Sequence, residues 1–501
     1  MFWKREKKPQ EICCPYCGKP FRPEELLFCD FDGDRVMDDQ QYDPVYAKFI
    51  SGMIPFDRVA LKSGDFIEMA RRPKYFFHPW HKDYSKEKPF TKPIKIENST
   101  EHDLYPSTIT VYRKNGLTPA MLETGGAAAE QAQAEGKLSG EGKNGLFDRE
   151  QEHATSDRPT FSGDATSRLR TKACPHCHCM LPENVGLYPM HRVVMLGSTR
   201  AGKTTYMTLA AHQLASGVGM PAGLVSDCVI GEESARYFDY LVNCLKANVV
   251  PATLLMKKDM IQVVFPIVVT VRPKGGYAPF FLVINDCPGE AMNDGHFLDD
   301  FTALRDAIGA ILMMDPCQFT GVLKEDVHKV EEQGLHMDVC DQQFNRTLDK
   351  IKPRLSEFKK LCQIAMTLTK LDLIYGEGPD YRIQRGMYPY MDKEDLREQH
   401  ANAIDLEWIN QLSLQVSGAI TRQLNYEAYA PSLDSVLDHA REVNITTLCC
   451  SIRTWNNAER KFIMPSGIQG ENQNVNMLGY RLLEPLLCIL GQCGLLPAKD
   501  A

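Results

Sequence analysis

"MLGSTRAGKTTYMTLA", residues 195–210, contains the spacing G-x-x-x-x-G-K-[ST] that is typical of a phosphate-binding loop. The apolar run "HRVVMLG" at 191–197 predicts a buried strand, and the spacing of apolar residues after the loop predicts a helix. A strand, a glycine-bounded loop and a helix N-terminus place backbone N–H groups around a phosphate. We therefore expect nine consecutive residues to hold a phosphate: Gly197, Ser198, Thr199, Arg200, Ala201, Gly202, Lys203, Thr204 and Thr205.

Two side chains of this loop and one segment further along the chain would supply charge, metal ligands and a backbone N–H group. Lys203 is expected to reach the β- and γ-phosphates, and the Thr204 hydroxyl to bind Mg²⁺. A hairpin turn at 274–277 separates two β-rich runs, and the second run delivers Asp286 and Gly289 in the pattern D-x-x-G. A carboxylate at that strand end can hold Mg²⁺ through water, while the Gly289 amide can meet a γ-phosphate.

A third motif indicates which base is bound. "CQIAMTLTKLDLI", residues 362–374, predicts another buried strand, and it ends in Thr369, Lys370, Leu371 and Asp372. An aspartate accepts hydrogen bonds from N1–H and the amino group of guanine together. Adenine has an acceptor at N1 and no amino group at C2, so a site built for guanine rejects it. Lys370 is expected to lie along the base and brace the loop.

A fourth segment, "VNITTLCCSIRTW" at 443–455, predicts the next strand of the same sheet. It brings Ser451 and Ile452 to the end of that strand. We expect a backbone N–H group of this pair to donate to the guanine O6.

Two cysteine turns of the form C-P-x-C indicate a metal site. They are Cys14-Pro-Tyr-Cys17 and Cys174-Pro-His-Cys177. Two such pairs in a reducing compartment favour a single zinc held by all four thiolates. The alternatives are two separate buried thiol pairs or a redox C-x-x-C, and the redox form is disfavoured because neither pair opens a helix after a strand. Further candidate ligands are Cys13, Cys29 and Cys179.

Composition narrows the class of protein. The chain has 501 residues with 43% hydrophobic and 24% charged residues, as in a globular protein of several domains. A net charge of −8 argues against nucleic acid as the main partner. The odd number of cysteines, 17, and a start without a signal peptide indicate a reducing cytosol. Cys228, Cys244, Cys362 and Cys488 are therefore expected to be free thiols in apolar runs. With no apolar stretch that could span a bilayer, we expect a cytoplasmic protein.

Shifts in composition divide the chain into five segments. Residues 124–168 are rich in Gly, Ala, Glu, Ser and Gln, a composition that cannot bury enough apolar surface to fold. From residue 191 onwards strand and helix patterns alternate, as in a parallel α/β domain. We expect half of a zinc ribbon at 1–30, an inserted α/β or β region at 31–123, a disordered linker at 124–168, the second half of the ribbon at 169–188, and the phosphate-loop domain at 189–501.

The motifs at 197–204, 286–289 and 369–372, in this order and with a hairpin before the second, resemble the first, third and fourth motifs of Ras-like GTPases of the TRAFAC class. The resemblance covers roughly residues 189–500. It implies an α/β fold with a mostly parallel sheet, one antiparallel hairpin and helices on both faces. It also implies Mg²⁺-dependent hydrolysis of GTP to GDP and phosphate, with switch segments controlled by the nucleotide.

The two C-P-x-C turns in front of the phosphate loop further resemble bacterial double-GTPase proteins. This finer resemblance implies a protein partner, such as a second GTPase. The zinc ribbon would then serve as a docking or stability module.

Three positions depart from or extend the Ras-like pattern. Ras-like enzymes usually carry glutamine after D-x-x-G to orient the attacking water, whereas this chain has Glu290, which donates nothing when ionised. Thr369 stands where asparagine is commoner. Thr253 is the candidate for the switch threonine that binds Mg²⁺, since it lies after the first helix and before the hairpin; the alternative is an ordinary loop threonine.

Arg200 occupies the fourth position of the phosphate loop. Potassium-activated GTPases, which the chain resembles, hold asparagine there and use it to bind a monovalent cation. The guanidinium of Arg200 can replace that cation in cis as an arginine finger. The alternative is that Arg200 points to solvent or pairs with a nearby acid.

Two other functions stay open beside a GTPase whose catalytic groups are Lys203, Arg200, Thr253, Gly289 and Glu290. A GTP-binding scaffold with little turnover is motivated by Glu290. An ATPase or small-molecule kinase would use the same phosphate loop, but it requires the motif at 369–372 to be coincidental.

Overall fold

The computed structural model describes residues 12–22, 25–30, 40–42, 46, 49, 53–54, 71–73, 75–76, 94–95, 170–182, 184–198, 201–246, 263–287, 306–316, 360–379, 381–393, 396–424, 444–456, 458–463 and 479–499. It divides into two compact units. The N-terminal unit comprises Met1–Leu187 and Gly231–Tyr240, and the C-terminal unit comprises Tyr188–Ile230 and Leu241–Ala501.

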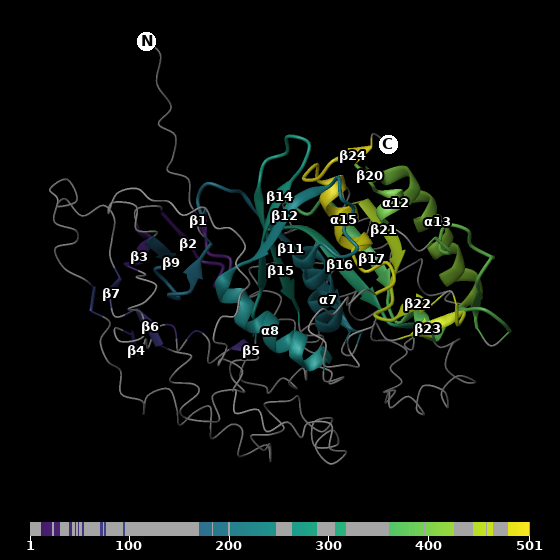
Figure 1. Ribbon diagram of the computed structural model, residues 1–501, viewed down its shortest axis with the longest axis horizontal. Coiled ribbons are helices and arrows are strands. Elements are labelled where there is room, and N and C mark those ends of the chain that lie inside the picture. The colour runs from purple at the N-terminus through teal and green to yellow at the C-terminus, as the bar shows by residue number, and fades with distance from the viewer. Residues whose placement is uncertain are drawn as a thin grey trace, which may run out of the picture. The chain divides into compact units, whose positions relative to one another are not determined.

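A seven-stranded sheet forms the core of the C-terminal unit (Figure 1). Its inner strands are mostly apolar and buried, as expected for strands covered on both faces, whereas the edge strand β12 is largely exposed. Their order across the sheet is β12 (Val225–Ile230), β14 (Ile267–Pro273), β15 (Phe280–Asp286), β11 (Met190–Gly197), β16 (Ala307–Met314), β17 (Gln363–Leu368) and β21 (Asn444–Cys449).

Five neighbouring strands, from β15 to β21, run parallel, and β14 and β12 are antiparallel to their neighbours. Met195 lies opposite Asp286, and Gly197 lies opposite Met313. Because the carboxyl ends of parallel strands meet at one edge, the residues that follow β11, β15, β16, β17 and β21 gather there. Ligands of open α/β sheets bind at that edge. The predicted mixed α/β class with a mostly parallel sheet is confirmed.

The antiparallel hairpin of β14 and β15 is present where the sequence predicts it. Its turn uses Gly275 and Gly276 with φ of 71° and 83°, values that side chains other than glycine rarely adopt.

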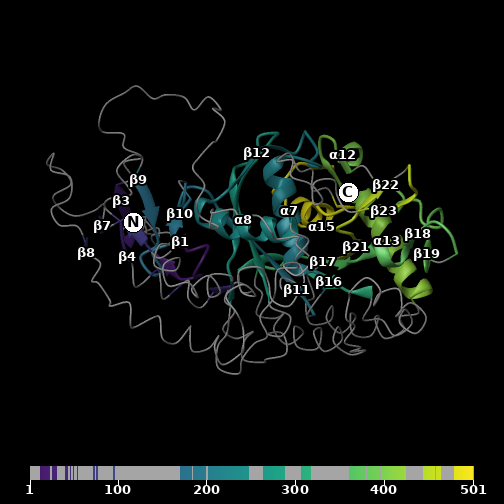
Figure 2. The ribbon, with the colours of Figure 1, turned by 60° about the horizontal axis from the view of Figure 1, so that its bottom comes forward.

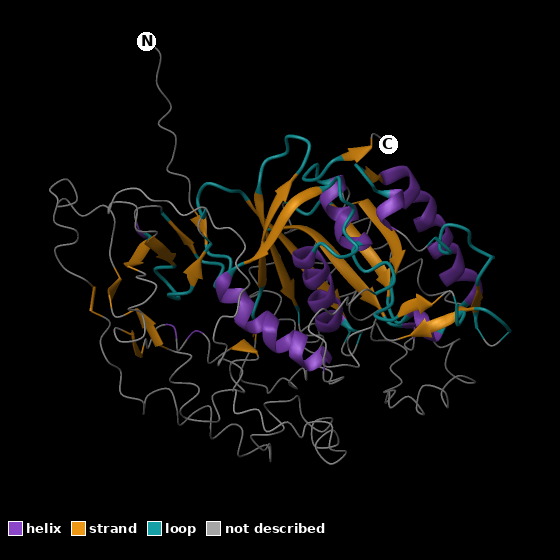
Figure 3. Cartoon of the chain, viewed as in Figure 1, coloured by secondary structure: helices purple, strands orange, loops and turns teal. Residues whose placement is uncertain are grey.

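Three long helices pack against this sheet (Figure 3). Helix α7 (Lys203–Ser216) packs on β11, β12, β14 and β15, and ends at Gly217 in the left-handed conformation. Helix α13 (Leu406–Gln423) packs on β21, and its N-cap Asp405 accepts from the Trp408 amide at 2.9 Å. Helix α15 (Glu484–Gln492) packs on β16 and β17, and has proline in its first turn.

Short elements complete the described part of the C-terminal unit: β13 (Val263–Val264), η7 (Leu371–Leu373), β18 (Tyr375–Gly376), β19 (Ile383–Gln384), α12 (Leu396–Gln399), β20 (Ile404–Asp405), β22 (Thr454–Asn456), β23 (Lys461–Ile463) and β24 (Ala498–Lys499).

In the N-terminal unit, short strands carry the cysteine turns (Figure 2). The strands are β1 (Ile12–Cys13), β2 (Pro20–Phe21), β3 (Leu27–Asp30), β4 (Gln40–Tyr42), β5 (Met53–Ile54), β6 (Arg71–Pro73), β7 (Tyr75–Phe76), β8 (Ile94–Lys95), β9 (Arg170–Ala173) and β10 (Met180–Leu181). β1 pairs with β2, and β9 lies between β3 and β10. The first residues of α8 (Glu232–Lys246) belong to this unit. The predicted linker at 124–168 lies outside the described residues.

One expectation about the cysteines is wrong. Cys362, predicted to be a free thiol, forms a disulfide with Cys493, because the start of β17 lies beside the end of α15. Cys228 and Cys488 are free and buried, as predicted. Across the described ranges, the structure contains no helix that is both long and apolar enough to cross a membrane.

Candidate nucleotide site and metal centre

The phosphate loop connects the end of β11 to the start of α7. Gly197 closes the strand with φ of 144°, and a Cβ atom there would lie 2.8 Å from the Met313 carbonyl oxygen. Gly202 is the N-cap of α7 with φ of 88°. Both glycines are therefore required by the backbone path, and they turn the N-terminus of α7 towards the loop.

Lys203 folds back over this loop. Its Nζ donates to the carbonyl oxygens of Gly197 at 2.9 Å and Ser198 at 2.7 Å. The residue is 6% exposed, so its ammonium group is held inside the loop rather than in solvent. This is the position from which a lysine can neutralise the charge of a bound phosphate.

Thr204, at the start of α7, and Asp286, at the end of β15, meet beside Lys203. The Thr204 hydroxyl donates to Asp286 Oδ2 at 2.5 Å. Asp286 is 1% exposed, and burial raises the pKa of its carboxyl group, although Lys203 and the Thr204 hydrogen bond lower it in part. Among the described residues, Oδ1 of Asp286 has no hydrogen-bond partner. A buried, half-satisfied carboxylate next to a hydroxyl offers the oxygen ligands that Mg²⁺ takes, so the residues fit that cation.

Thr369 joins the phosphate loop to the segment predicted to read the base. Its hydroxyl lies 3.0 Å from the Ala201 carbonyl oxygen and 3.1 Å from that of Met314. Lys370 adopts φ of 51°, and its Nζ donates to Asp315 at the end of β16. The motif at 369–372 is thereby fixed beside the phosphate loop. Asp315, an acid at a strand end, is a member of this site that the sequence motifs did not single out.

Asp372 lies against the residues that follow β21. The Ser451 hydroxyl donates to Asp372 Oδ1 at 2.6 Å, and Arg453 Nε lies 3.5 Å from Oδ2. The Asp372 side chain is only 8% exposed, so these contacts fix its orientation. The Ser451 amide donates to the Tyr480 carbonyl at 3.0 Å, which leaves Ile452 as the member of the predicted pair whose N–H group can meet a base.

Five predicted site residues lie outside the described residues, and the structure says nothing of their placement: Thr199, Arg200, Thr253, Gly289 and Glu290. Thr205 is described, half-buried, in the first turn of α7.

The four predicted zinc ligands converge in the N-terminal unit. The sulfur atoms of Cys14, Cys17, Cys174 and Cys177 all lie within 4.8 Å of one another. The distances from Cys14 to Cys177 and from Cys17 to Cys174 are both 3.8 Å. Zinc with Zn–S bonds of about 2.3 Å in a tetrahedron separates its sulfur ligands by about 3.8 Å. The donor set therefore fits zinc.

The two cysteine turns have the same backbone hydrogen bonds. Gly18 and His178 donate their amides to the carbonyls of Cys14 and Cys174, and both adopt positive φ, of 69° and 57°. The amides of Tyr16 and His176 lie 3.4 Å from the sulfur atoms of Cys14 and Cys174. Such N–H groups compensate the negative charge of thiolates.

The environment of the sulfur atoms also favours a bound cation. Burial raises the pKa of the Cys14 and Cys177 thiols well above the ordinary range, and the surrounding cysteines raise that of Cys177 further. A metal bound by these sulfur atoms would have to displace their protons, because cysteine binds metals as the thiolate. Cys13 and Cys179, predicted as further candidates, form no disulfide within the described residues and do not belong to the group of four.

Glu233 of α8 is a buried acidic residue of the N-terminal unit that the sequence motifs did not single out. It is 2% exposed and accepts from the Tyr46 hydroxyl at 2.6 Å and the Met180 amide at 2.7 Å. Met180 lies in β10, three residues after Cys177, so this carboxylate fixes the strand that leaves the second cysteine turn.

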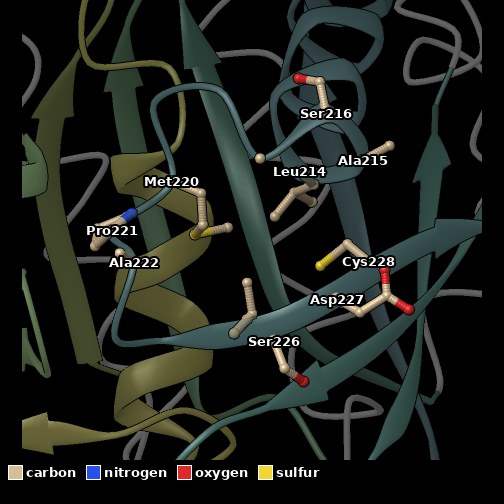
Figure 4. Close-up of a pocket in the computed structure, with 11 residues that line it drawn as sticks. Leu214, Ala215, Ser216, Met220, Pro221, Ala222, Ser226, Asp227 and Cys228 are labelled. Carbon is tan, nitrogen blue, oxygen red and sulfur yellow. The ribbon is translucent and has the colours of Figure 1, made fainter.

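A hollow of about 250 Å³ lies at the C-terminal end of α7 (Figure 4). It is lined by the end of the helix at 214–217, the turn at 220–222 and β12 residues 225–228. Since α7 has 14 residues, the hollow is about 20 Å from the phosphate loop. It is not part of the nucleotide site.

Comparison with known proteins gives little to add. No family model matches the chain, and no curated protein matches it. Among the solved structures, the crystal structure of the S. cerevisiae Ski7 GTPase-like domain, bound to GTP, is similar at 14% identity and a TM-score of 0.22. The match covers 53% of this chain and 44% of that chain, so less than half of the Ski7 domain is matched. This likeness to a GTPase-like domain is weak, and no conclusion rests on it.

Proposed function

We propose that this chain is a Mg²⁺-dependent GTPase of the Ras-like type that carries a zinc ribbon. One observation supports this most: Asp372, oriented by the Ser451 hydroxyl, lies at the same sheet edge as Lys203. Thr369 connects the two parts through its hydroxyl contact with the loop carbonyl of Ala201. A guanine nucleotide requires a carboxylate that reads the base at the same sheet edge as the loop that binds its phosphates.

The proposed roles combine the described positions of Lys203, Thr204 and Asp286 with the sequence motifs that contain Thr253 and Gly289. Lys203 neutralises the β- and γ-phosphates, and the backbone N–H groups at the start of α7 bind their oxygens. Thr204 and Asp286 would hold Mg²⁺, with Thr253 as a further ligand when GTP is bound. The cation supplies charge compensation for the phosphate oxygens. The Gly289 amide would contact the γ-phosphate, and segments around Thr253 and Gly289 would act as the switch.

Guanine recognition is assigned to the end of β17 and the turn after β21. Asp372 accepts from N1–H and the amino group, the Ile452 amide donates to O6, and Lys370 braces the loop. An ATPase is disfavoured because adenine would face Asp372 with an acceptor at N1.

The zinc ribbon is proposed as a module for stability or for docking a protein partner, such as a second GTPase. The four converging sulfur atoms support the zinc. A cytoplasmic location is proposed because most described cysteines lie outside a disulfide, the pair Cys362 and Cys493 being the exception.

A competition experiment tests the proposed nucleotide. Purified protein is loaded with a fluorescent guanine nucleotide in Mg²⁺ and challenged with GTP, GDP, ATP or ADP. Guanine nucleotides should displace the probe at concentrations at least a thousandfold lower than adenine nucleotides. Equal displacement by ATP would reject guanine specificity.

A second candidate function, a GTP-binding scaffold with little turnover, is favoured by Glu290 at the position where Ras-like enzymes usually carry glutamine. Single-turnover hydrolysis separates the two functions. Rapid conversion of bound GTP to GDP supports the enzyme, and bound GTP that persists for hours supports the scaffold.

A further inference from the structure

The turn that orients Asp372 begins where the pairing of β21 with β17 ends. Their register ends at Cys449; beyond it the Cys450 amide donates to the Leu368 carbonyl, and the Leu371 amide donates to the Cys450 carbonyl at 3.3 Å. Ser451 comes next, and its hydroxyl holds Asp372.

Tyr480 pairs with this turn instead. The Tyr480 amide donates to the Ser451 carbonyl at 2.8 Å, and the Ser451 amide donates to the Tyr480 carbonyl at 3.0 Å. The Tyr480 amide also lies 3.2 Å from the Arg453 carbonyl, and the Tyr480 hydroxyl donates to the Met391 carbonyl. The residues beside Asp372 are thus held by a segment about thirty positions further along the chain.

Arg481 fixes that segment from the inside of the protein. Its side chain is 0% exposed, and Nε and Nη2 donate to the two carboxylate oxygens of Glu484 at 2.8 Å and 2.7 Å. Nη1 donates to the carbonyls of Tyr390 and Lys393. The guanidinium also lies 4.8 Å over the ring of Trp408.

The backbone of Arg481 adopts an unfavourable conformation that the surrounding contacts must stabilise. Its φ is 56°, in the region that side chains other than glycine rarely adopt. Burial lowers the pKa of the guanidinium, but the Glu484 carboxylate more than offsets this, so the pKa is raised and the charge is kept. A bidentate, buried, stacked arginine has the geometry that lysine cannot reproduce.

We infer that Arg481 is a positioning residue for base recognition: it fixes Tyr480, which holds Ser451 and Ile452 in the orientation that guanine requires. The inference rests on the proposed guanine site. Without the Arg481 side chain, the turn at 451–453 keeps its link to β21 and its pairing with Tyr480, but Tyr480 loses the buried anchor that sets its position. Asp372 then loses a defined hydroxyl donor, and the Ile452 amide loses its defined position.

The experiment measures the ratio of dissociation constants for ADP and GDP in two variants. Arg481→Lys keeps the charge and loses the bidentate and stacked contacts. The double variant Arg481→Met with Glu484→Leu removes both members of this ion pair at similar volume, so that neither is left buried without the other. Ile489→Ala is the control, because Ile489 is a buried side chain of α15 that packs on Gly309 of β16. Its loss lowers stability through a cavity.

Both arginine variants should reduce the preference for GDP over ADP at least tenfold, while Ile489→Ala lowers the melting temperature and keeps the preference of the wild type. Arginine variants that fold and keep the ratio within threefold of the wild type would overturn the inference. So would a control that loses the preference as much as they do. A wild type without preference for GDP would instead reject the proposed guanine site itself, and the inference with it.

Discussion

At the scale of single residues, Asp286 is the clearest case of a side chain that lowers the stability of the folded protein and has a proposed function. Its carboxylate is buried, and only one of its oxygens has a partner within the described residues. Since burial raises the pKa of this group, deprotonation favours the unfolded chain, and the free energy of unfolding falls as the pH rises through the pKa of the folded state. A carboxylate that costs stability at neutral pH is consistent with the proposed role of Asp286 as a ligand of Mg²⁺.

Asp286→Asn should therefore stabilise the protein in the absence of Mg²⁺ and nucleotide, by about 2–4 °C in melting temperature. The difference should shrink as the pH is lowered, because a protonated Asp286 carries no charge. The same variant should lose the further stabilisation that Mg²⁺ and GTP give to the wild type. Differential scanning fluorimetry from pH 5 to 8 measures all three effects. A variant that melts lower than the wild type without ligand and is still stabilised by Mg²⁺ and GTP would contradict the assignment.

Arg200 can be tested by its salt dependence. If its guanidinium replaces a monovalent cation, the wild type hydrolyses GTP equally in sodium and potassium, and Arg200→Ala is slow in both, by about 10³-fold or more. Arg200→Asn should regain rate in potassium alone. Single-turnover hydrolysis is the measurement. Wild-type turnover that depends on potassium, or an alanine variant as fast as the wild type, would show that Arg200 has no such role.

At the scale of elements, two matching cysteine turns from distant parts of the sequence form the candidate metal centre. Their spacing and local sequence were enough to predict which four cysteines meet, since each C-P-x-C turn presents two sulfur atoms to one side. The contacts of Glu233 with Tyr46 and Met180 were not predictable, because nothing in the helical pattern of α8 distinguishes a buried glutamate from an exposed one. The disulfide of Cys362 was missed for a different reason: its partner Cys493 is 131 positions away, and no local pattern links the two.

The shared zinc predicts equal effects of changing either turn. Cys14→Ser and Cys174→Ser should each reduce the bound zinc from about one per chain to nearly none, because three thiolates bind far more weakly than four. Cys179→Ser is the matched control, a buried cysteine beside the second turn that should leave the metal content unchanged. Metal analysis by mass spectrometry measures the content. If only one of the two turns affects it, the turns do not share a metal.

At the scale of the whole molecule, the described residues of the predicted nucleotide site lie where five parallel strands of the C-terminal unit end. The order of motifs along the chain was enough to predict this, because apolar runs that end in loop, aspartate or threonine residues mark strand ends of a parallel sheet. What supports the motifs was not predictable. Arg481, Glu484 and Tyr480 resemble ordinary residues of a helix start, and only the fold brings them to Ser451. Recognition motifs are local in sequence, but the contacts that orient them are not.

The central claim is that this sheet edge binds guanine. Its most direct test is to substitute Asp372 and to measure which nucleotide base the variant prefers. In Asp372→Asn, the amide oxygen of the new side chain can accept the Ser451 hydroxyl, and its NH₂ group then faces position 2 of the base. Guanine presents an amino group there and is repelled, whereas xanthine presents an oxygen and is accepted. Titration calorimetry with GDP and xanthosine diphosphate should show that the variant loses about 10²-fold or more in GDP affinity and prefers xanthosine diphosphate. A folded variant that binds GDP as tightly as the wild type would contradict the claim.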